Sequence, residues 1–471
     1  MSSTLAEGRG EAADVLTNRT YDEIAVGDSA SLEHTISRDD IALFALVTGD
    51  ANPTHVDPEY AASPGKKGLT AHSLLGGSLL SALLGDRLPG PGTVYRRQAF
   101  DFLKPPMQGD TLHVEIVAKE KQAGGIVAFD CRATNQHGET LFTGRAEVIA
   151  PTEKISRVRA ALPKVGLKRH DKWNRLTALA KSLDPLPTCV VYPCDESSLR
   201  AAVEAADEGI IEPIVVGPLE RIEAVAANAG INVLRFECID VPDAEAAAQA
   251  AVVRVNQGAQ ALMKGSLHTD ELLKAVVAKD SGLRGSRRMS HCFVMDVPGH
   301  DDVLIVTDAA VNIAPTLDVK ADIVQNAIEL ARALGIEPRV AILSAVETVN
   351  PKMQSTVDAA ALKHMAERGQ ITGGLVDGPF AFDNAINLDA ARIKGITSPV
   401  AGRANVLVVP DIEAGNMLAK NLTFMADADA AGIVLGALVP IVLTSRADSV
   451  LTRLASAALA ALVVHHTSVA L

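Results

Sequence analysis

The sequence is poor in aromatic residues and in paired cysteines. The first scarcity limits which residues can form the core, and the second limits which classes of protein the chain can belong to. Phe, Tyr and Trp make up 3% of the 471 residues, so Ala, Val, Leu and Ile must supply the core of a chain that is 48% hydrophobic. The five cysteines include no C-x-x-C pair, which argues against a disulfide framework and against a zinc site. This cysteine usage fits a reducing compartment. We therefore predict a cytoplasmic protein with no bound metal.

Positive charge is also scarce. The chain has 44 Lys and Arg against 57 Asp and Glu, a formal net charge of −13. Nucleic-acid backbones are bound by clustered cations, so a nucleic acid is not a predicted partner. One basic run, between Lys154 and Arg175, is an exception. We interpret it as a solvated linker and helix face, with a patch for a partner or for CoA phosphates as the alternative.

Long hydrophobic runs are missing as well. The chain does not open with a signal peptide, and its late apolar run, Leu454 to Val464, is shorter than the about 20 residues that span a bilayer. This run therefore predicts a buried helix rather than a membrane segment. The opening residues, Met1 to Ala13, are small, polar and without periodicity, so we expect them to be disordered.

Two helices are predicted in the first 150 residues. Ser37 followed by Asp40 has the pattern of a helix N-cap with an acidic third residue, which begins a helix over 39–47. The stretch AHSLLGGSLLSALLGD, residues 71–86, is apolar on nearly all sides and predicts a buried helix. Gly76 and Gly77 within it would let a sheet approach closely.

Strands follow this second helix. Residues 112–118 alternate between apolar and polar, Gly124-Gly125 predicts a turn, and 126–134 and 141–149 predict two more strands of an antiparallel meander. A central helix wrapped by such a meander is the pattern of an α+β hot-dog fold. We assign this domain to residues 15–150.

After a predicted linker over 151–180, the pattern changes to an α/β domain over 181–471. Short continuous apolar segments alternate with Ala-rich amphipathic ones, which predicts parallel sheets covered on both faces, in two lobes. The apolar segments are 190–192, 213–216, 233–236, 261–263, 303–306, 340–343, 374–376, 406–409 and 433–443. Two domains also suit a chain of this length.

One candidate site lies in the segment GDANPTHVD, which follows the first predicted helix. Asp50 and His55 place a carboxylate and an imidazole five residues apart in a loop. Such a pair can hold a water molecule and move protons both ways, as the addition of water to a conjugated C=C bond requires. The alternative is a surface turn in which Asp50 is only a local cap.

The segment GDANPTHVD resembles the D-x-N-P-x-H signature of MaoC-like, (R)-specific enoyl-CoA hydratases, and residues 71–86 and 92–112 resemble their central helix and following strands. The resemblance implies that Asp50 and His55 transfer protons, that Asn52 orients the loop and that Ser81 supports the site. It also implies that a backbone amide at the helix start holds the thioester oxygen. The family usually has His-Gly there, whereas this chain has His72-Ser73, which predicts weaker activity or a narrower acyl range.

A second candidate site lies near the end, where residues 442–449 (VLTSRADS) join a strand to a helix. Such turns collect ligands in α/β sheets, helix N-termini bind anions, and Arg446 adds a bidentate cation. The alternative is an N-cap made by Ser445 or Asp448, beside a surface arginine.

Residues 185–471 resemble phosphate acetyltransferases and phosphate butyryltransferases. The resemblance rests on the segments VYPCDESSLRAAVEAADEGIIEPIVVGP, LMKGSLHT, VTDAAVNIAP, LVDGPFAFDNA, PDIEAGNMLAKNL and VLTSRADS. It implies the exchange of CoA and inorganic phosphate on one acyl carbonyl, with no bound cofactor. Ser445 would stabilise the sulfur or the oxyanion and Arg446 would hold phosphate. The resemblance also implies a cleft lined by Lys264, Thr269, Asp308, Asn312, Asp377, Asn416 and Asp448.

The chain departs from acetyl-specific members of this family. Phe424 and Thr452 stand where those members carry an Arg and an Asp, and an Arg near Lys274 is absent. The departures favour a butyryl-type or larger acyl group and leave Asp448 as a weak candidate for the base.

The two halves in this order resemble a known fusion, a bifunctional enoyl-CoA hydratase/phosphate acetyltransferase. Two alternatives remain: a silent C-terminal sensor of acetyl-CoA or acyl phosphate, or a hot-dog domain kept only for assembly. Both families form oligomers, so we predict a homodimer or a larger homo-oligomer.

Overall fold

The chain folds into two compact units, Met1–Val165 and Gly166–Leu471. The computed structural model describes residues 14–163, 165, 167, 171–300, 302–443 and 449–470. The predicted disorder at Met1 to Ala13 lies outside these residues.

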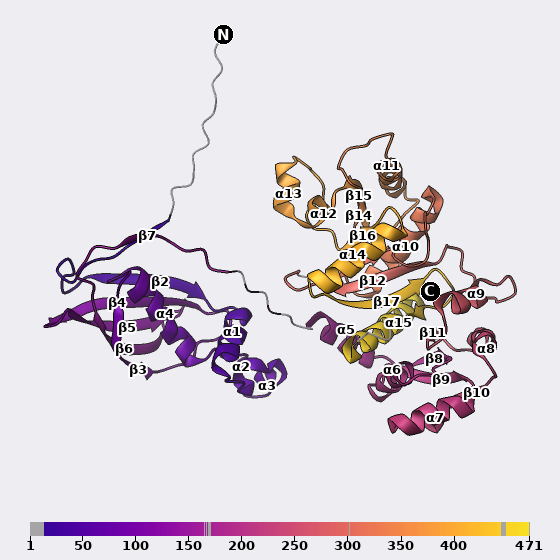
Figure 1. Cartoon of the computed structure of the whole chain (residues 1–471), viewed down its shortest axis with the longest axis horizontal. Coiled ribbons are helices and arrows are strands. Elements are labelled where there is room, and N and C mark those ends of the chain that lie inside the picture. Colours follow the sequence, from indigo (N-terminus) through magenta and orange to yellow (C-terminus); the bar gives the residue numbers. More distant parts are fainter. Residues whose placement is uncertain are drawn as a thin grey trace, which may run out of the picture. The chain divides into compact units, whose positions relative to one another are not determined.

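The first unit is built on a five-stranded antiparallel sheet, shown in indigo and purple in Figure 1. In sheet order its strands are β2 (Ser29–Thr35), β4 (Thr111–Gln122), β5 (Ile126–Thr134), β6 (Thr140–Ile149) and β3 (Val94–Phe102). The β4–β5–β6 meander confirms the predicted strands. β3 is an edge strand and carries exposed apolar side chains, among them Val94, Tyr95 and Phe102.

Helix α4 (Ser73–Asp86) packs on this sheet, which confirms the predicted hot-dog architecture. The predicted close approach at its two glycines is also confirmed: a methyl group at Gly77 would lie 2.9 Å from the ring of Phe100. The prediction that the helix is buried on nearly all sides is wrong. Leu74 is 57% exposed because only one face of the helix meets the sheet.

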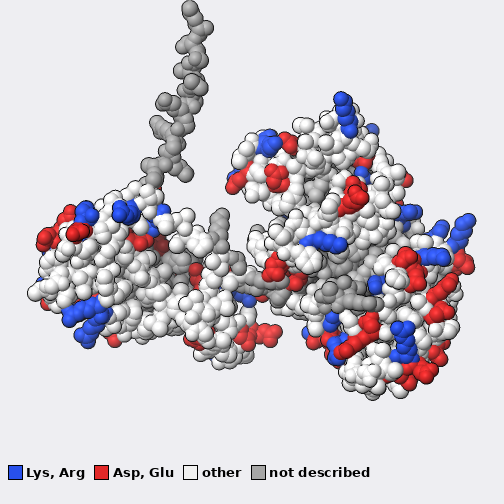
Figure 2. Space-filling model, in the orientation of Figure 1, with Lys and Arg blue, Asp and Glu red and all other residues white. Residues whose placement is uncertain are grey.

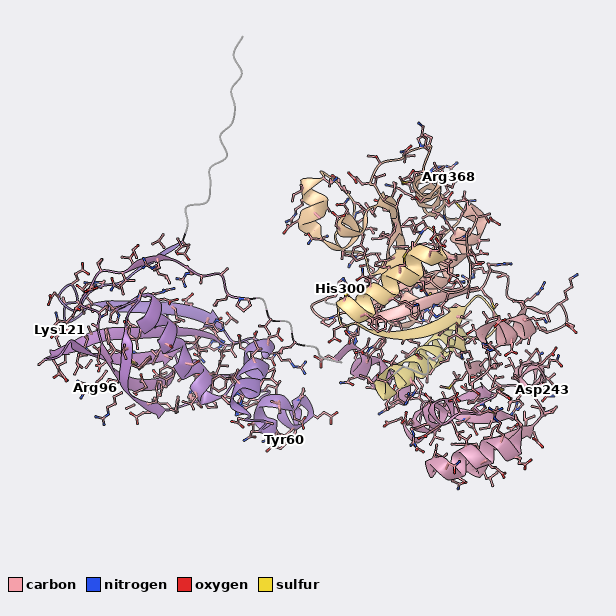
Figure 3. All side chains as sticks on the ribbon, viewed as in Figure 1. Tyr60, Arg96, Lys121, Asp243, His300 and Arg368 are labelled. Atoms are coloured by element: carbon pink, nitrogen blue, oxygen red, sulfur yellow. The ribbon has the colours of Figure 1, made fainter. Side chains whose placement is uncertain are left out.

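Three short helices precede α4: α1 (Arg38–Thr48), α2 (Pro53–Val56) and α3 (Pro58–Ala62). The Ser37–Asp40 capping box predicted for α1 is present. Burial alone would raise the pKa of Asp40, but hydrogen bonds from Ser37 and His34 outweigh it and lower this pKa. In Figure 3, Tyr60 marks α3 at one end of the unit, and Lys121 marks the β4–β5 hairpin at the other.

The prediction of a linker over 151–180 is wrong at two places. Strand β7 (Ser156–Val158) pairs with β1 (Val15–Thr17) in a small antiparallel ribbon. Helix α5 (Asp171–Lys181) packs against the last helix of the chain, α15, and buries Trp173 completely. The helix was missed because the segment is polar and basic overall, although α5 buries one apolar face that includes Trp173 and Leu176.

The second unit is built on one eleven-stranded sheet. In sheet order its strands are β10 (Glu237–Asp240), β9 (Ile211–Gly217), β8 (Leu186–Val191), β11 (Ala261–Lys264), β18 (Ile441–Val442), β17 (Asp429–Leu435), β12 (Ser290–Asp296), β13 (Leu304–Thr307), β16 (Val406–Val408), β14 (Arg339–Leu343) and β15 (Leu375–Phe380). The α/β prediction is confirmed, but the sheet is not wholly parallel. β12 runs antiparallel to both neighbours, and β17 runs antiparallel to β18.

Helices cover both faces of this sheet (Figure 1). They are α6 (Glu196–Asp207), α7 (Leu219–Ala229), α8 (Ala244–Asn256), α9 (Thr269–Val277), α10 (Leu317–Ala333), α11 (Gln354–Glu367), α12 (Phe382–Ile386), α13 (Leu388–Ile393), α14 (Ile412–Met425) and α15 (Val450–Ala470). α15 is long and apolar enough to cross a membrane. Its residues 455 and 457–462 are buried in the core of the unit, so the predicted buried helix is confirmed.

Cations and carboxylates are interspersed on the face of the molecule shown in Figure 2. The same mixing holds for the described part of the basic run. Lys154 contacts Glu23, Arg159 contacts Asp14 and Asp86, and Lys172 contacts Asp296. The exposed pairs of Lys154 and Arg159 favour the interpretation of this part of the run as solvated, whereas Lys172 and Asp296 form a largely buried pair.

Candidate functional sites

The loop between α1 and α2 carries the first candidate site. Gly49 ends α1 in the left-handed conformation, with φ 75°, and turns the chain so that Asp50 follows at the surface. The Asp50 carboxylate accepts a hydrogen bond from the Asn52 amide at 3.2 Å. Asn52 is the N-cap of α2, and its side-chain oxygen accepts from the Thr54 amide at 3.1 Å. This places Asn52 where it fixes the loop.

His55 lies one turn into α2, held by Thr70. Its Nδ1 is 2.6 Å from the Thr70 carbonyl oxygen. Because a carbonyl oxygen can only accept, Nδ1 carries the proton, and Nε2 of the neutral ring keeps its lone pair. His55 can therefore take a proton at Nε2 while its ring stays oriented.

His72 reaches the same place from the start of α4, of which it is the N-cap. Its side chain is only 4% exposed, and its ring centroid is 3.8 Å from that of His55. Nε2 of His72 is 3.2 Å from the Asp50 carbonyl oxygen and 3.6 Å from the Asp50 carboxylate. The buried Nδ1 has no hydrogen-bond partner among the described residues. The sequence suggested that His72 marks the helix start, but not that it touches both members of the pair.

One ligand atom from each of Asp50, His55 and His72 lies within 4.8 Å of the others. A carboxylate and an imidazole this close can share a water molecule and pass protons to and from it. The same three groups are also of the type that holds a divalent transition metal. The side chain of Asp50 is half exposed, so small molecules can reach the cluster.

An apolar hollow of about 330 Å³ adjoins this cluster. Phe44 connects them, because its ring lines the hollow and lies 5.1 Å from the ring of His72. Ser81 also lines the hollow, about 12 Å along the helix axis from Ser73, which begins α4. The predicted role of Ser81 in supporting the site therefore concerns the hollow and not the Asp50–His55 end of the site.

Ser73 is the first residue of α4, and no side chain caps the amides of that first turn. A helix start with uncapped amides can stabilise a developing oxyanion, in line with the predicted role for the backbone amide there.

The second candidate site is only partly described. Ser445, Arg446 and Asp448 lie outside the described residues. The flanks of this turn are visible: Leu443 donates its amide to Gly432, and the hydroxyl groups of Ser449 and Thr452 lie 3.0 Å apart. Thr452 is buried in the first turn of α15 and hydrogen-bonds locally, which suits a structural residue.

Asp308 and Asn312 form a tight buried turn after β13. The Asp308 carboxylate accepts the amides of residues 310, 311 and 312 and the Asn312 side-chain amide. Nε of Arg288 is 3.4 Å from the side-chain oxygen of Asn312. The Asp308 carboxylate therefore holds the loop, and Arg288, which contacts Asn312, lines the neighbouring cavity.

A cavity of about 930 Å³ opens beside this turn. Thr269 lines it, as do Lys274 and Arg288. Arg288 was not singled out from the sequence. It is one of two adjacent arginines that lie outside any motif, and such residues are usually surface charges. The cavity is large enough for a nucleotide-sized ligand.

Three predicted cleft residues lie elsewhere. Asp377 is on edge strand β15, three strands from β13 or about 14 Å across the sheet, and pairs with Lys363 at 2.8 Å. Lys264 ends β11 and donates to the carbonyls of Gly265 and Leu267. Asn416 lies on α14 beside Gly415, where an added Cβ would lie 2.7 Å from the Asp308 carbonyl oxygen. None of the three lines the large cavity.

His291 is a buried group that the sequence did not reveal. It lies at the start of β12, and burial lowers its pKa to about 4 although Asp308 acts in the opposite direction. The ring is therefore neutral at physiological pH. A side chain at Gly432 would lie 3.0 Å from both Nε2 of His291 and the Leu443 carbonyl oxygen, so His291 packs beside the strand that leads into the 444–448 turn.

Comparison with known families matches both units. A model described as "Phosphate acetyl/butaryl transferase" matches residues 242–461, and one described as "MaoC like domain" matches residues 25–138.

Individual relatives match the second unit along most of their own length. A phosphate acetyltransferase of Rhizobium meliloti is 64% identical over 293 residues, which are 62% of this chain and 93% of that protein. A phosphate butyryltransferase of Clostridium acetobutylicum is 43% identical over 293 residues, which are 62% and 97%. The crystal structure of a branched-chain phosphotransacylase from Enterococcus faecalis V583 is similar with a TM-score of 0.53 and 32% identity, over 60% of this chain and 100% of that one. The chain therefore belongs to the phosphate acetyl/butyryl transferase family and carries a MaoC-like domain ahead of its transferase domain.

Proposed function

We propose that the chain is a bifunctional enzyme of short acyl-CoA thioesters. The transferase domain exchanges CoA and inorganic phosphate on the acyl carbonyl, and the MaoC-like domain adds water to a 2-enoyl-CoA with (R) selectivity. CoA thioesters and phosphate are substrates, and neither reaction requires a resident cofactor. The observation that carries the hydratase half is the contact of Asp50, His55 and His72 at the edge of an apolar hollow.

The geometry supports a defined division of labour in hydration. The thioester oxygen meets the amides at the start of α4, where the helix dipole favours developing negative charge. Asp50 and His55 hold the water. Nε2 of His55 takes one of its protons as the hydroxyl adds to the β-carbon, and the Asp50–His55 pair returns a proton to the α-carbon. The acyl chain extends over Phe44 into the hollow. Ser73 adds a hydroxymethyl group beside the thioester, which favours small acyl groups.

For the transferase half, we propose acetyl and other short acyl groups as substrates. The 64% identical relative is named an acetyltransferase, and others are named butyryltransferases. The sequence argument for a larger acyl group used Phe424, but that ring is 81% exposed on α14 and lines none of the described cavities. It therefore gives no reason to disfavour acetyl-CoA.

Phosphate-dependent release of CoA tests the transferase half. The purified protein should release free thiol from acetyl-CoA only when phosphate is present. Arg446→Ala should lose about 2.7–4 kcal/mol of transition-state stabilisation, the range found when one oxyanion donor is removed. Full activity in this variant would remove Arg446 from the mechanism. Binding of acetyl-CoA without any turnover in the wild type would favour the silent sensor instead.

A further inference from the structure

The MaoC-like domain places two imidazoles and one carboxylate in mutual contact, which is more than a proton-transfer pair needs. Asp50 comes from the loop after α1, His55 from α2 and His72 from the N-cap of α4. Their ligand atoms lie within 4.8 Å of one another. The elements that carry them are packed together by Phe44 and by the hydrogen bond of His55 to Thr70.

We propose that Asp50, His55 and His72 bind Zn²⁺ or a similar divalent transition metal, and that this metal inhibits hydration. Two neutral imidazoles and a carboxylate, with one position left open, are a common donor set for such ions. The proposed inhibition rests on the proposed hydratase function, whereas the binding itself does not.

His55 is already arranged as a metal ligand. Its Nδ1–H donates to the Thr70 carbonyl oxygen at 2.6 Å, which fixes the tautomer with the lone pair on Nε2. An imidazole held through its other nitrogen by a backbone carbonyl is the usual support of a metal-binding histidine.

His72 must change tautomer to bind an ion through Nε2, and the change leaves a buried N–H without an acceptor in the described part of the chain. Its Nε2 now makes only a 3.2 Å hydrogen bond to the Asp50 carbonyl oxygen, and its buried Nδ1 has no partner among the described residues. Moving the proton to Nδ1 would therefore break one long hydrogen bond and free Nε2, which already faces the Asp50 carboxylate at 3.6 Å. The buried Nδ1 is unpartnered in either tautomer.

Asp50 supplies part of the movement that closes the site. Ligand atoms on one tetrahedral Zn²⁺ lie about 3.3 Å apart, given Zn–N and Zn–O bonds of about 2.0–2.2 Å. The atoms here span up to 4.8 Å, so they must approach one another. Asp50 is in a loop with its side chain half exposed, so it can move. The two imidazoles, whose centroids are 3.8 Å apart, must also turn out of their stacked arrangement so that both lone pairs point at one ion. The bound ion would then take the lone pairs that hydration needs.

Cobalt(II) binding to the full-length protein tests the metal site by absorption spectroscopy and does not depend on enzymatic activity. We expect Co²⁺ to give the visible d–d absorption of a four-coordinate ion, and Zn²⁺ to displace it. Asp50→Asn and His72→Gln should each weaken Co²⁺ binding at least about tenfold. His113→Gln is the matched control, because His113 also lies beside a carboxylate, Glu33 at 3.7 Å, but has no second imidazole. It should bind Co²⁺ as the wild type does.

His72 is buried, so the melting temperature of each variant is measured alongside, and the surface variant Asp50→Asn keeps the test valid if His72→Gln fails to fold. An absorption that is absent in the wild type, or that survives unchanged in Asp50→Asn, would overturn the proposal. In the hydration assay, Zn²⁺ should inhibit and EDTA should restore activity. A protein that binds Co²⁺ at these residues but does not hydrate crotonyl-CoA even after EDTA treatment and with the Ser73→Gly change would refute the hydratase function and leave the metal site standing.

Discussion

Two side chains of the MaoC-like domain should decide hydration. Asp50→Asn keeps the shape of the loop but removes the carboxylate that shares the water with His55, so the rate of crotonyl-CoA hydration should fall by about 10²–10⁴-fold. Loss of the enoyl absorbance measures it. Asp101→Asn, an exposed carboxylate on β3, is the control and should leave the rate unchanged.

If the wild type hydrates no enoyl-CoA, Ser73 is the first residue to change. Ser73→Gly removes the side chain beside the thioester and keeps the helix-start amide, so it should restore activity. A well-folded Ser73→Gly protein that is still inactive would leave the first domain as a scaffold for assembly.

The neutral, buried His291 should make the transferase domain sensitive to acid. Its pKa is lowered to about 4 by burial, whereas in the unfolded chain it is near 6.5. Between these pH values the unfolded chain binds a proton that the folded chain does not, so stability is present above pH 6.5 and is lost as the pH falls toward 4. The loss attributable to this residue is about 3 kcal/mol.

Denaturation at a series of pH values measures this effect as a difference between proteins. His291→Gln removes the titrating group, so its stability should depend less steeply on pH between 6.5 and 4 than that of the wild type. The exposed His113→Gln should behave as the wild type does. Parallel pH profiles for wild type and His291→Gln would show that His291 is not the group responsible.

Short-range features of the first site could be predicted from sequence, and long-range ones could not. Asp50, Asn52 and His55 lie within one loop and one helical turn, so their spacing nearly fixes their geometry. The contact of His72 with Asp50 joins residues 22 positions apart and depends on how α4 packs. Arg288 and Asp377 illustrate the same limit: strand order in the sheet, which the sequence does not state, brings one to the cavity and keeps the other from it.

At the scale of elements, helix α4 offers a paired test of close packing. Gly77→Ala would press a methyl group to 2.9 Å from Phe100, so we expect a loss of about 1–3 kcal/mol in unfolding free energy. Gly85 is in the same helix with nothing within 4 Å of the added methyl, so Gly85→Ala should gain up to about 1 kcal/mol from helix propensity. Chemical denaturation measures both. An unchanged unfolding free energy in Gly77→Ala would show that the sheet can move away from the helix.

Strand direction is where the sequence-based prediction of elements failed. Apolar runs such as β12 can be identified as buried, but a strand buried on both faces looks alike in either direction. The run 433–443, predicted as one strand, contains a turn at Gly436, where φ is 95°, and it divides into the antiparallel β17 and β18. The run 233–236 became a 3-10 turn (Val233–Arg235), with β10 beginning just after it.

At the scale of the whole molecule, the two activities should be separable. Asp50→Asn should abolish hydration and leave phosphate-dependent CoA release nearly unchanged, and Arg446→Ala should do the reverse, because sites in separate units without shared partners behave additively. Both activities are measured in each variant. Damage to both activities by Asp50→Asn in a folded protein would show that the domains are coupled.

The molecule should also assemble at least into dimers. β3 ends the first sheet with an unpaired edge and exposes Val94, Tyr95 and Phe102, a combination that monomeric proteins avoid. Light scattering at micromolar concentration should give at least twice the 49.3 kDa chain mass. Val94→Lys with Phe102→Lys should lower that mass if this edge is an interface. A monomeric wild type would contradict the prediction.

The small ribbon of β1 and β7 has a consequence for how such a chain can arise. Val15 is paired with Val158, so the polypeptide enters and leaves the MaoC-like domain at the same point. A domain whose two ends are held together by backbone hydrogen bonds can be fused to another protein, or removed from it, without disrupting its own sheet. The ribbon thus makes residues 15–158 a self-contained module, and fusion of its gene to another needs only a connecting segment.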